Sequence, residues 1–246
     1  MMKLGYQRWD DMLFMHWDVP VDVVRRAVDP RLEVDTFDGR AFVSLTPFTM
    51  RNARLRFTPP LPAISRFDEV NFRTYVRHRD KAGLWFFSLD AASPFAVVMA
   101  RALVGLPYAL AKTRRWRSGE ERHYELERRA GGQSANLRVA WEPGRELGPA
   151  PMGTLEHFLV ERYCLFSRTV GGALLRVDVE HRPWTLREAR ILQLEESISK
   201  AAQVGGPSDG RWAHASEGVD ATFTGVALVE PPAFATQFRP TTRQPA

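Results

Sequence analysis

The stretch FDEVNFRTYVR (residues 67–77) alternates between apolar and polar side chains over the length of a β-strand. Its apolar residues Val70, Phe72 and Val76 share one face, which is typical of a strand packed on a hydrophobic core. The other face carries polar groups unlike those of a routine solvated surface: Glu69, Asn71, Arg73 and Tyr75. We expect these four side chains to line a concave ligand-binding site; the alternative is a solvated face with a charge ladder.

Glu69 and Arg73 lie four residues apart, so they cannot pair directly within one extended strand. Each strand residue adds about 3.3 Å, which separates the two residues by about 13 Å. Each side chain must therefore find its partner on a neighbouring strand or on a ligand. Because a guanidinium makes two charge-assisted hydrogen bonds to a carboxylate, Arg73 indicates an anionic ligand such as a carboxylate.

Strand-like segments and turn signals dominate the rest of the chain. Asp38-Gly39 accepts the positive φ angles of a tight turn, and it predicts a hairpin between residues 32–37 and 41–50. Turn signals recur at intervals of roughly 8 to 12 residues. This pattern favours an α+β protein with a mainly antiparallel sheet, curved into a barrel or sandwich, with two or three helices packed on it.

Two later stretches combine capping residues with helical spacing. Ser93 and Gly105 delimit a buried helix at Pro94–Val104, and Thr154 begins a second helix over residues 154–166. Arg101 is the only charge in the first helix, so it is either buried with a partner, where it is a further ligand-binding candidate, or extends to solvent. Arg162 in the second helix poses the same question.

Composition and charge exclude several classes of protein. Among 246 residues, 34 Lys+Arg and 29 Asp+Glu give a formal net charge of +5. Hydrophobic residues at 44% and charged residues at 26% are ordinary for a globular domain, which excludes disordered, collagenous and coiled-coil proteins. The basic residues are scattered and interleaved with acidic ones, so we expect no nucleic-acid partner.

The expected compartment is the cytoplasm. Cys164 is the single cysteine, which precludes an intrachain disulfide and is typical of a reducing environment. The chain starts without an apolar run of signal-peptide length, and no apolar stretch reaches the roughly 20 residues of a membrane span, so we expect no membrane partner.

We expect one domain over residues 1–232 and a loose C-terminal tail at residues 233–246. The oligomeric state stays open, a homo-oligomer included.

Motifs for nucleotide, metal and serine-hydrolase chemistry are absent from the sequence. There is no glycine-rich phosphate loop, no GxGxxG and no GxSxG. The six histidines never fall at HxH or HExxH spacing, and the one cysteine stands apart from them. We therefore expect no metal site and no cofactor.

Seven short motifs, taken in order, resemble a known family: MHWDVP (15–20), FDGRAFVSLTPFTM (37–50), EVNFRTYV (69–76), GLPYALAK (105–112), ERYCLF (161–166), HRPWTL (181–186) and EGVDATFTG (217–225). This set closely resembles the YqjF-like family, uncharacterised bacterial proteins grouped structurally with acetoacetate decarboxylase. The resemblance spans about residues 10–232. It implies an acetoacetate-decarboxylase-like fold, which is a closed antiparallel β-barrel with flanking helices and a central ligand cavity.

The resemblance also bears on Schiff-base chemistry. In acetoacetate decarboxylase a pocket lysine forms an imine with the keto acid, and a neighbouring cation lowers the pKa of the amine. The enzyme's signature pairs an acidic residue with a later glycine, aromatic, proline, lysine, lysine run. Glu69 resembles the acidic position and residues 105–107 resemble the start of that run, but Tyr108 and Ala109 stand at the lysine positions. We therefore do not expect lyase chemistry of the parent kind.

Three hypotheses for function follow, from different classes. The first is a protein that binds a small anionic organic ligand in a β-barrel cavity, with any reaction left open. Its proposed lining is Glu69, Asn71, Arg73, Tyr75 and Tyr108. The second is a Schiff-base-forming decarboxylase or aldolase that uses Lys112, the one lysine near the second motif. The third is a structural or interaction protein without a ligand site.

We predict that acetoacetate and pyruvate will not be trapped as a reduced imine on Lys112. This lysine lies three residues beyond Ala109, and an odd displacement along a strand places it on the opposite face. An amine nucleophile also needs its pKa lowered far below the usual value of about 10.4. Borohydride treatment with each keto acid, followed by intact-mass measurement, checks this. A stoichiometric adduct mapped to Lys112 would place the lysine-dependent enzyme first.

Overall fold

The computed structural model describes residues 3–60, 65–207 and 212–231. The strands of these residues are β1 (Gly5–Val19), β2 (Glu33–Val34), β3 (Ala41–Leu55), β4 (Phe67–His78), β5 (Lys81–Ala91), β6 (Tyr108–Ser118), β7 (Glu121–Ala130), β8 (Asn136–Gly148), β9 (Cys164–Arg168), β10 (Leu174–His181), β11 (Leu186–Glu196) and β12 (Trp212–Glu230). The helices are α1 (Val21–Ala27), α3 (Pro94–Val104), α4 (Leu155–Val160) and α5 (Ile198–Ala201). The expected tail at residues 233–246 lies outside the described residues, as does the proposed domain boundary at 232.

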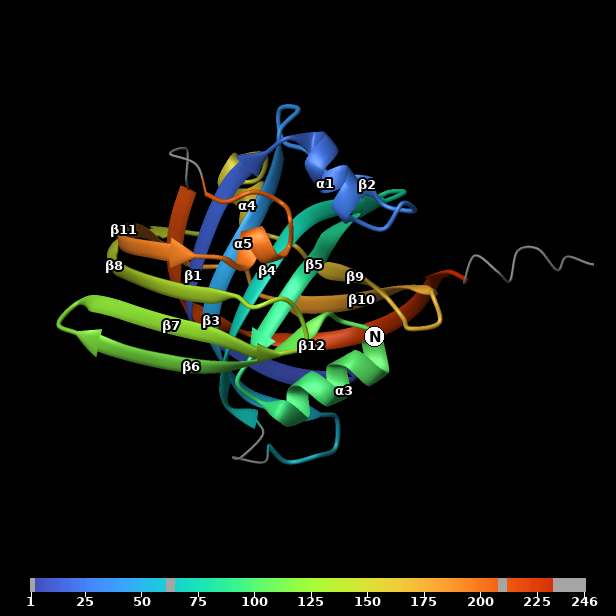
Figure 1. Cartoon of the computed structure of the whole chain (residues 1–246), viewed down its shortest axis with the longest axis horizontal. Coiled ribbons are helices and arrows are strands. Elements are labelled where there is room, and N and C mark those ends of the chain that lie inside the picture. The colour runs from blue at the N-terminus through green and yellow to red at the C-terminus, as the bar shows by residue number, and fades with distance from the viewer. Residues whose placement is uncertain (1–2, 61–64, 208–211, 232–246) are drawn as a thin grey trace, which may run out of the picture.

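The described strands form one sheet in the order β10-β9-β5-β6-β7-β8-β11-β12-β1-β3-β4-β2. Additional pairings of β5 with β4 and of β10 with β12 join distant parts of this order, so the strands form a ring (Figure 1). Most pairs are antiparallel, but β5 pairs in parallel with β6 and with β9. Helix α3 supplies the crossover that the parallel β5–β6 pair requires. The mainly antiparallel class with few helices, predicted from the sequence, is confirmed.

The turn at Asp38-Gly39 is confirmed, but the hairpin around it is not. Both residues have positive φ, at 49° and 75°, and Phe37 and Arg40 exchange two backbone hydrogen bonds of 3.0 Å. Only β2 is extended before this turn, and it pairs with β4. Strand β3 is already hydrogen-bonded to β1 on one side and to β4 on the other, so it has no free edge for the preceding segment.

Helix α3 has the predicted limits, but the prediction that it is buried is wrong. The Ser93 hydroxyl caps its first turn, and Gly105 ends it with a φ of 66°. Val97 is its one buried residue, whereas the side chains of Phe95 and Leu103 are 50% and 61% exposed. The helix runs along the outside of the strands, where it contacts β5 and β6 (Figure 1). Its apolar composition therefore does not reflect enclosure on all sides.

The second predicted helix is much shorter than residues 154–166. Helix α4 begins at the predicted cap, because the Thr154 hydroxyl accepts a hydrogen bond from the backbone of His157. It ends at Val160, and residues 164–168 form β9 between β10 and β5. A short apolar run such as this one cannot be assigned to helix or strand by periodicity alone. The two adjacent strands decide its conformation.

Residues 12–17 of β1, 41–50 of β3 and 69–76 of β4 are buried on both faces of their strands and separate two hydrophobic clusters. On β4, Val70, Phe72 and Val76 belong to one cluster, and Tyr75 belongs to the other. The four polar residues of β4 named above retain exposed fractions of 9% or less. The alternative that they form a solvated face is therefore wrong, and they lie on the side of the second cluster.

We predict that Phe72→Ala will lower the free energy of unfolding by about 3–5 kcal/mol, because it removes a large side chain from the closed core. Phe72 has no exposed surface and stacks on Trp17 with the ring centroids 5.8 Å apart. Urea denaturation measures the effect. Phe57→Ala is the matched control: Phe57 is 88% exposed, so its loss should change stability by no more than about 0.5 kcal/mol. Equal losses for the two variants would contradict the two-sided burial of β4.

Candidate functional site

Glu69 and Tyr108 form a buried hydrogen-bonded pair. The pairings of β4 with β5 and of β5 with β6 bring the two residues together, and Tyr108 Oη donates to Glu69 Oε2 at 3.1 Å. Burial raises the pKa of Glu69 to about 8; the hydrogen bond from Tyr108 opposes this, and the charge of Asp90 adds to it. Glu69 is therefore mostly protonated at neutral pH, and a pKa perturbed this strongly by burial marks a candidate functional residue.

Tyr75 connects β4 to His16 of β1 and to the end of α4. Its hydroxyl donates to the carbonyl oxygen of Leu159 at 2.7 Å and lies 3.1 Å from His16 Nδ1. His16 has no exposed surface. Burial, and then the positive charge of Arg73, lower the pKa of His16 well below its ordinary value, so the ring is neutral at physiological pH.

Arg73 is a buried cation without an anionic partner. It is 9% exposed, and its guanidinium lies over the ring of Phe14, 5.8 Å from the centroid. Among the described residues no carboxylate forms an ion pair with Arg73, and its Nε has no hydrogen-bond partner; nearby Arg162, in contrast, pairs with Asp35 at 3.0 Å. Burial lowers the pKa of Arg73, and its interaction with the Tyr75 hydroxyl opposes this. Arginine side chains keep their proton in proteins, so Arg73 is a cation.

Several buried polar atoms on this side of the sheet lack hydrogen-bond partners within the described ranges. They are His214 Nδ1, His16 Nε2, Ser44 Oγ, Asn71 Oδ1 and Arg73 Nε. Strand register makes three of them neighbours, since His16 lies opposite Ser44 and Ser44 lies opposite Arg73. Asn71 lies two residues from Arg73 on β4, and His214 lies opposite Phe14, two residues from His16. Native proteins leave few buried polar groups unpaired, so such a cluster calls for an explanation. We call these five residues, with Glu69, Tyr75 and Tyr108, the polar face.

The structure brings most of the predicted site residues together and leaves two of them outside. Glu69, Asn71, Arg73, Tyr75 and Tyr108 all belong to the polar face. Arg101 and Lys112, in contrast, are exposed on α3 and β6.

The structure settles in opposite ways whether Arg101 and Arg162 are buried, and Arg162 lies just beyond the end of α4. Arg101 is exposed, because α3 lies on the outside of the strands. Arg162 is buried and paired with Asp35, and its guanidinium also lies 4.3 Å from the ring centroid of Phe158. Within the described residues, no group of three or more His, Cys, Asp or Glu side chains could hold a metal ion, and no helix is long and apolar enough to cross a membrane.

Sequence reasoning missed three residues of the polar face: His16, Ser44 and His214. The available signal was alternation, which places His16 on the same side of its strand as Met12 and Phe14. The segment from Met12 to His16 is buried on both faces, however, so alternation does not say which side meets the polar residues of β4. Only the pairing of β1 with β3, and of β3 with β4, supplies that answer.

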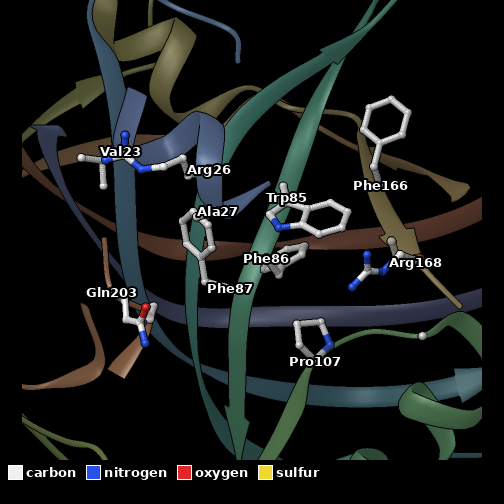
Figure 2. Close-up of a pocket in the computed structure, with 13 residues that line it drawn as sticks. Val23, Arg26, Ala27, Trp85, Phe86, Phe87, Pro107, Phe166, Arg168 and Gln203 are labelled. Carbon is white, nitrogen blue, oxygen red and sulfur yellow. The ribbon is translucent and has the colours of Figure 1, made fainter. Parts of the chain in front are cut away.

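Two pockets lie beside strands of the ring. The larger has a volume of about 580 Å³ and lies between α1, β5 and β9, with Trp85, Phe87 and Arg168 in its lining (Figure 2). Phe86 also lines it and lies opposite Arg73 in the β4–β5 pair. The second pocket, of about 480 Å³, is lined partly by His214, a member of the polar face. The larger pocket contains no residue of the polar face, so of the two only the second pocket adjoins that face, at His214.

Residues 6–220 match the family DUF2071, whose description is "Uncharacterized conserved protein". The chain belongs to this family. The uncharacterized protein YqjF of Bacillus subtilis (strain 168) is 34% identical over 217 residues, which are 88% of this chain and 89% of YqjF. The resemblance to YqjF-like proteins drawn from the seven motifs is thus confirmed for this DUF2071 chain.

Solved structures with a similar fold include enzymes related to acetoacetate decarboxylase. The enduracididine biosynthesis enzyme MppR superposes with a TM-score of 0.66 at 13% identity, covering 94% of this chain and 91% of MppR. Acetoacetate decarboxylase from Legionella pneumophila gives 0.65 at 14% identity, covering 92% and 88%. At these identities the likeness shows the fold alone, and it confirms the acetoacetate-decarboxylase-like fold of this member of the DUF2071 family.

We predict that Glu69→Gln will stabilise the protein increasingly as pH rises. The unfolded carboxyl ionises near its ordinary pKa of 4.5, while the folded one keeps its proton up to about 8. Native stability therefore falls between these values by up to about 1.4 kcal/mol per pH unit, and Gln removes this loss. Urea denaturation from about pH 5 to about pH 8 measures the difference.

Glu120→Gln is the control for this experiment, because Glu120 lies in an exposed turn. Its stability relative to the native protein should stay constant over the same pH range. A pH-independent difference for Glu69→Gln as well would mean that Glu69 is ionised in the folded protein.

Proposed function

We propose that this protein binds a small organic anion, a carboxylate, on the polar face inside the ring of strands. Arg73 carries the proposal, because it is a buried cation without an anionic partner among the described residues. Burying an unpaired charge costs several kcal/mol, and a ligand carboxylate that accepts two hydrogen bonds from the guanidinium would offset this cost. In this proposal the ring acts as a closed β-barrel with a central ligand cavity.

The groups around Arg73 suit an anion. Neutral His16 adds no negative charge that would repel a carboxylate, and Glu69, about 13 Å away along β4, is mostly protonated at neutral pH. The unpaired polar atoms of Ser44 and Asn71 offer further hydrogen bonds to a ligand. A structure of MppR, which has the same fold, is a complex with pyruvate, so a small carboxylate is a ligand of a related scaffold. We further propose a single cytoplasmic domain for this function, in keeping with the single cysteine.

The lysine-dependent alternative lacks a suitable amine. The four lysines of the chain, Lys3, Lys81, Lys112 and Lys200, are all exposed. An imine-forming lysine requires a lowered pKa, which usually comes from burial beside another cation. We therefore place carboxylate binding ahead of a lysine-dependent decarboxylase or aldolase, and the nature of any reaction stays open.

We predict that small carboxylates will raise the melting temperature of the native protein and that Arg73→Gln will abolish this shift. A thermal-shift screen of small mono- and dicarboxylates measures both effects. Arg101→Gln is the matched control, because Arg101 is exposed on α3 and should leave every ligand shift unchanged. A carboxylate that stabilises the native protein and the Arg73→Gln variant equally would show that it binds elsewhere.

Arg73→Leu separates this proposal from a purely structural role. Replacing a buried unpaired cation by an apolar side chain is expected to raise the ligand-free unfolding free energy by about 1–4 kcal/mol while removing ligand binding. If Arg73 instead has a structural role within a fully satisfied core, the same substitution will destabilise the protein. Urea denaturation without ligand distinguishes the two outcomes.

A further inference from the structure

The hydrogen-bond geometry around Tyr75 determines which nitrogen of His16 carries the proton. A phenol has one proton, and Tyr75 donates it to the carbonyl oxygen of Leu159, which can only accept. The contact between Tyr75 Oη and His16 Nδ1, at 3.1 Å, must therefore be a hydrogen bond donated by Nδ1. Neutral His16 then has a lone pair on Nε2, and this atom is a hydrogen-bond acceptor.

That acceptor is buried and has no donor in the part of the chain that the structure describes. His16 Nε2 is buried without a hydrogen-bond partner, and so is Asn71 Oδ1 on the neighbouring part of the polar face. An imidazole lone pair cannot be satisfied by a carboxylate, which offers only acceptors. A ligand that completes this site must therefore bring a donor of its own.

His16 and Arg73 are close enough to contact one small molecule. They belong to a row of residues across β1, β3 and β4, with Ser44 between them. Two strand spacings separate their backbones by about 10 Å, and both side chains extend from the same side of the sheet. Both also meet the ring of Phe14: His16 stacks on it with centroids 6.0 Å apart, and the Arg73 guanidinium lies 5.8 Å from its centroid.

We infer that the ligand is a small hydroxycarboxylate whose carboxylate contacts Arg73 and whose hydroxyl donates to His16 Nε2. This inference rests on the proposed binding of an anion at Arg73 and adds the second recognition element. It separates three classes of acid: a hydroxy acid offers the donor, a keto acid offers only acceptors, and the unsubstituted acid offers neither at that position. Leaving the buried acceptor unpaired should weaken binding of the latter two by about tenfold or more.

Calorimetric titration of the native protein with two matched series tests the inference. The series are lactate, pyruvate and propionate, and 3-hydroxybutyrate, acetoacetate and butyrate. In at least one series the hydroxy acid should bind about tenfold or more tightly than its two counterparts. His16→Phe keeps a ring beside Phe14 but removes the acceptor, so it should bind the hydroxy acid no better than the unsubstituted acid. The control is His123→Phe, because His123 lies on β7 in a stack with Trp116 and should leave all affinities unchanged.

The outcomes distinguish the inferred contact with His16 from the proposed binding of a carboxylate at Arg73. If hydroxy, keto and unsubstituted acids bind equally and Arg73→Gln abolishes all binding, the anion site stands and the contact with His16 is wrong. If no acid of either series binds, or if binding is indifferent to Arg73→Gln, both are wrong. Should His16→Phe fail to fold, the ¹⁵N resonance of His16 Nε2 in the native protein gives the answer. It should move with the hydroxy acid and not with the unsubstituted acid, and equal movement would overturn the inference.

Discussion

The burial of β4 on both of its faces is the constraint on which the candidate site depends. Val70, Phe72 and Val76 hold one face against a hydrophobic cluster, so the polar residues must enter the other. A slip of one residue in the strand register would place Arg73 in that first cluster, which strongly disfavours any other register. The burial of the apolar residues of β4 therefore fixes the position of its polar residues. These polar side chains are buried because the apolar residues next to them on the same strand hold β4 inside the core.

Buried charges elsewhere in the chain show what a satisfied group looks like in this protein. Asp90 has no exposed surface and pairs with Arg128, and Arg162 pairs with Asp35. Glu69 and Arg73 lie in the same interior without such partners, and burial shifts the pKa of each toward its neutral form. Glu161 is a further buried charge without an ion pair among the described residues, but hydrogen bonds from the Tyr163 hydroxyl and the backbone of Trp184 hold it. Arg73 differs because its Nε has no hydrogen-bond partner in the described part of the chain, which supports a functional reason for its burial.

Tyr108 shows how one scaffold accommodates different chemistry. It stands at a position that the resemblance to acetoacetate decarboxylase assigns to a lysine, and its hydroxyl donates to Glu69. A phenol cannot form an imine with a keto acid, but it can hold a carboxyl group in place and share a proton with it. In this chain the position therefore supplies a hydrogen-bond donor to Glu69 and no amine nucleophile.

Local sequence by itself determined the strand at residues 67–77, the caps of α3 and the four polar residues of β4, because alternation and capping depend on neighbouring residues. It also determined the family, since seven motifs in one order are specific. Local sequence did not determine the pairing partner of residues 32–37, the conformation of residues 164–168 or the exposure of α3, each of which depends on distant strands. The same holds for the site: His16 and Ser44 join Arg73 only through the register of β1 with β3 and of β3 with β4. Residues on three strands become one buried polar surface only when the sheet forms, because a strand specifies which of its side chains share a face but not what that face meets.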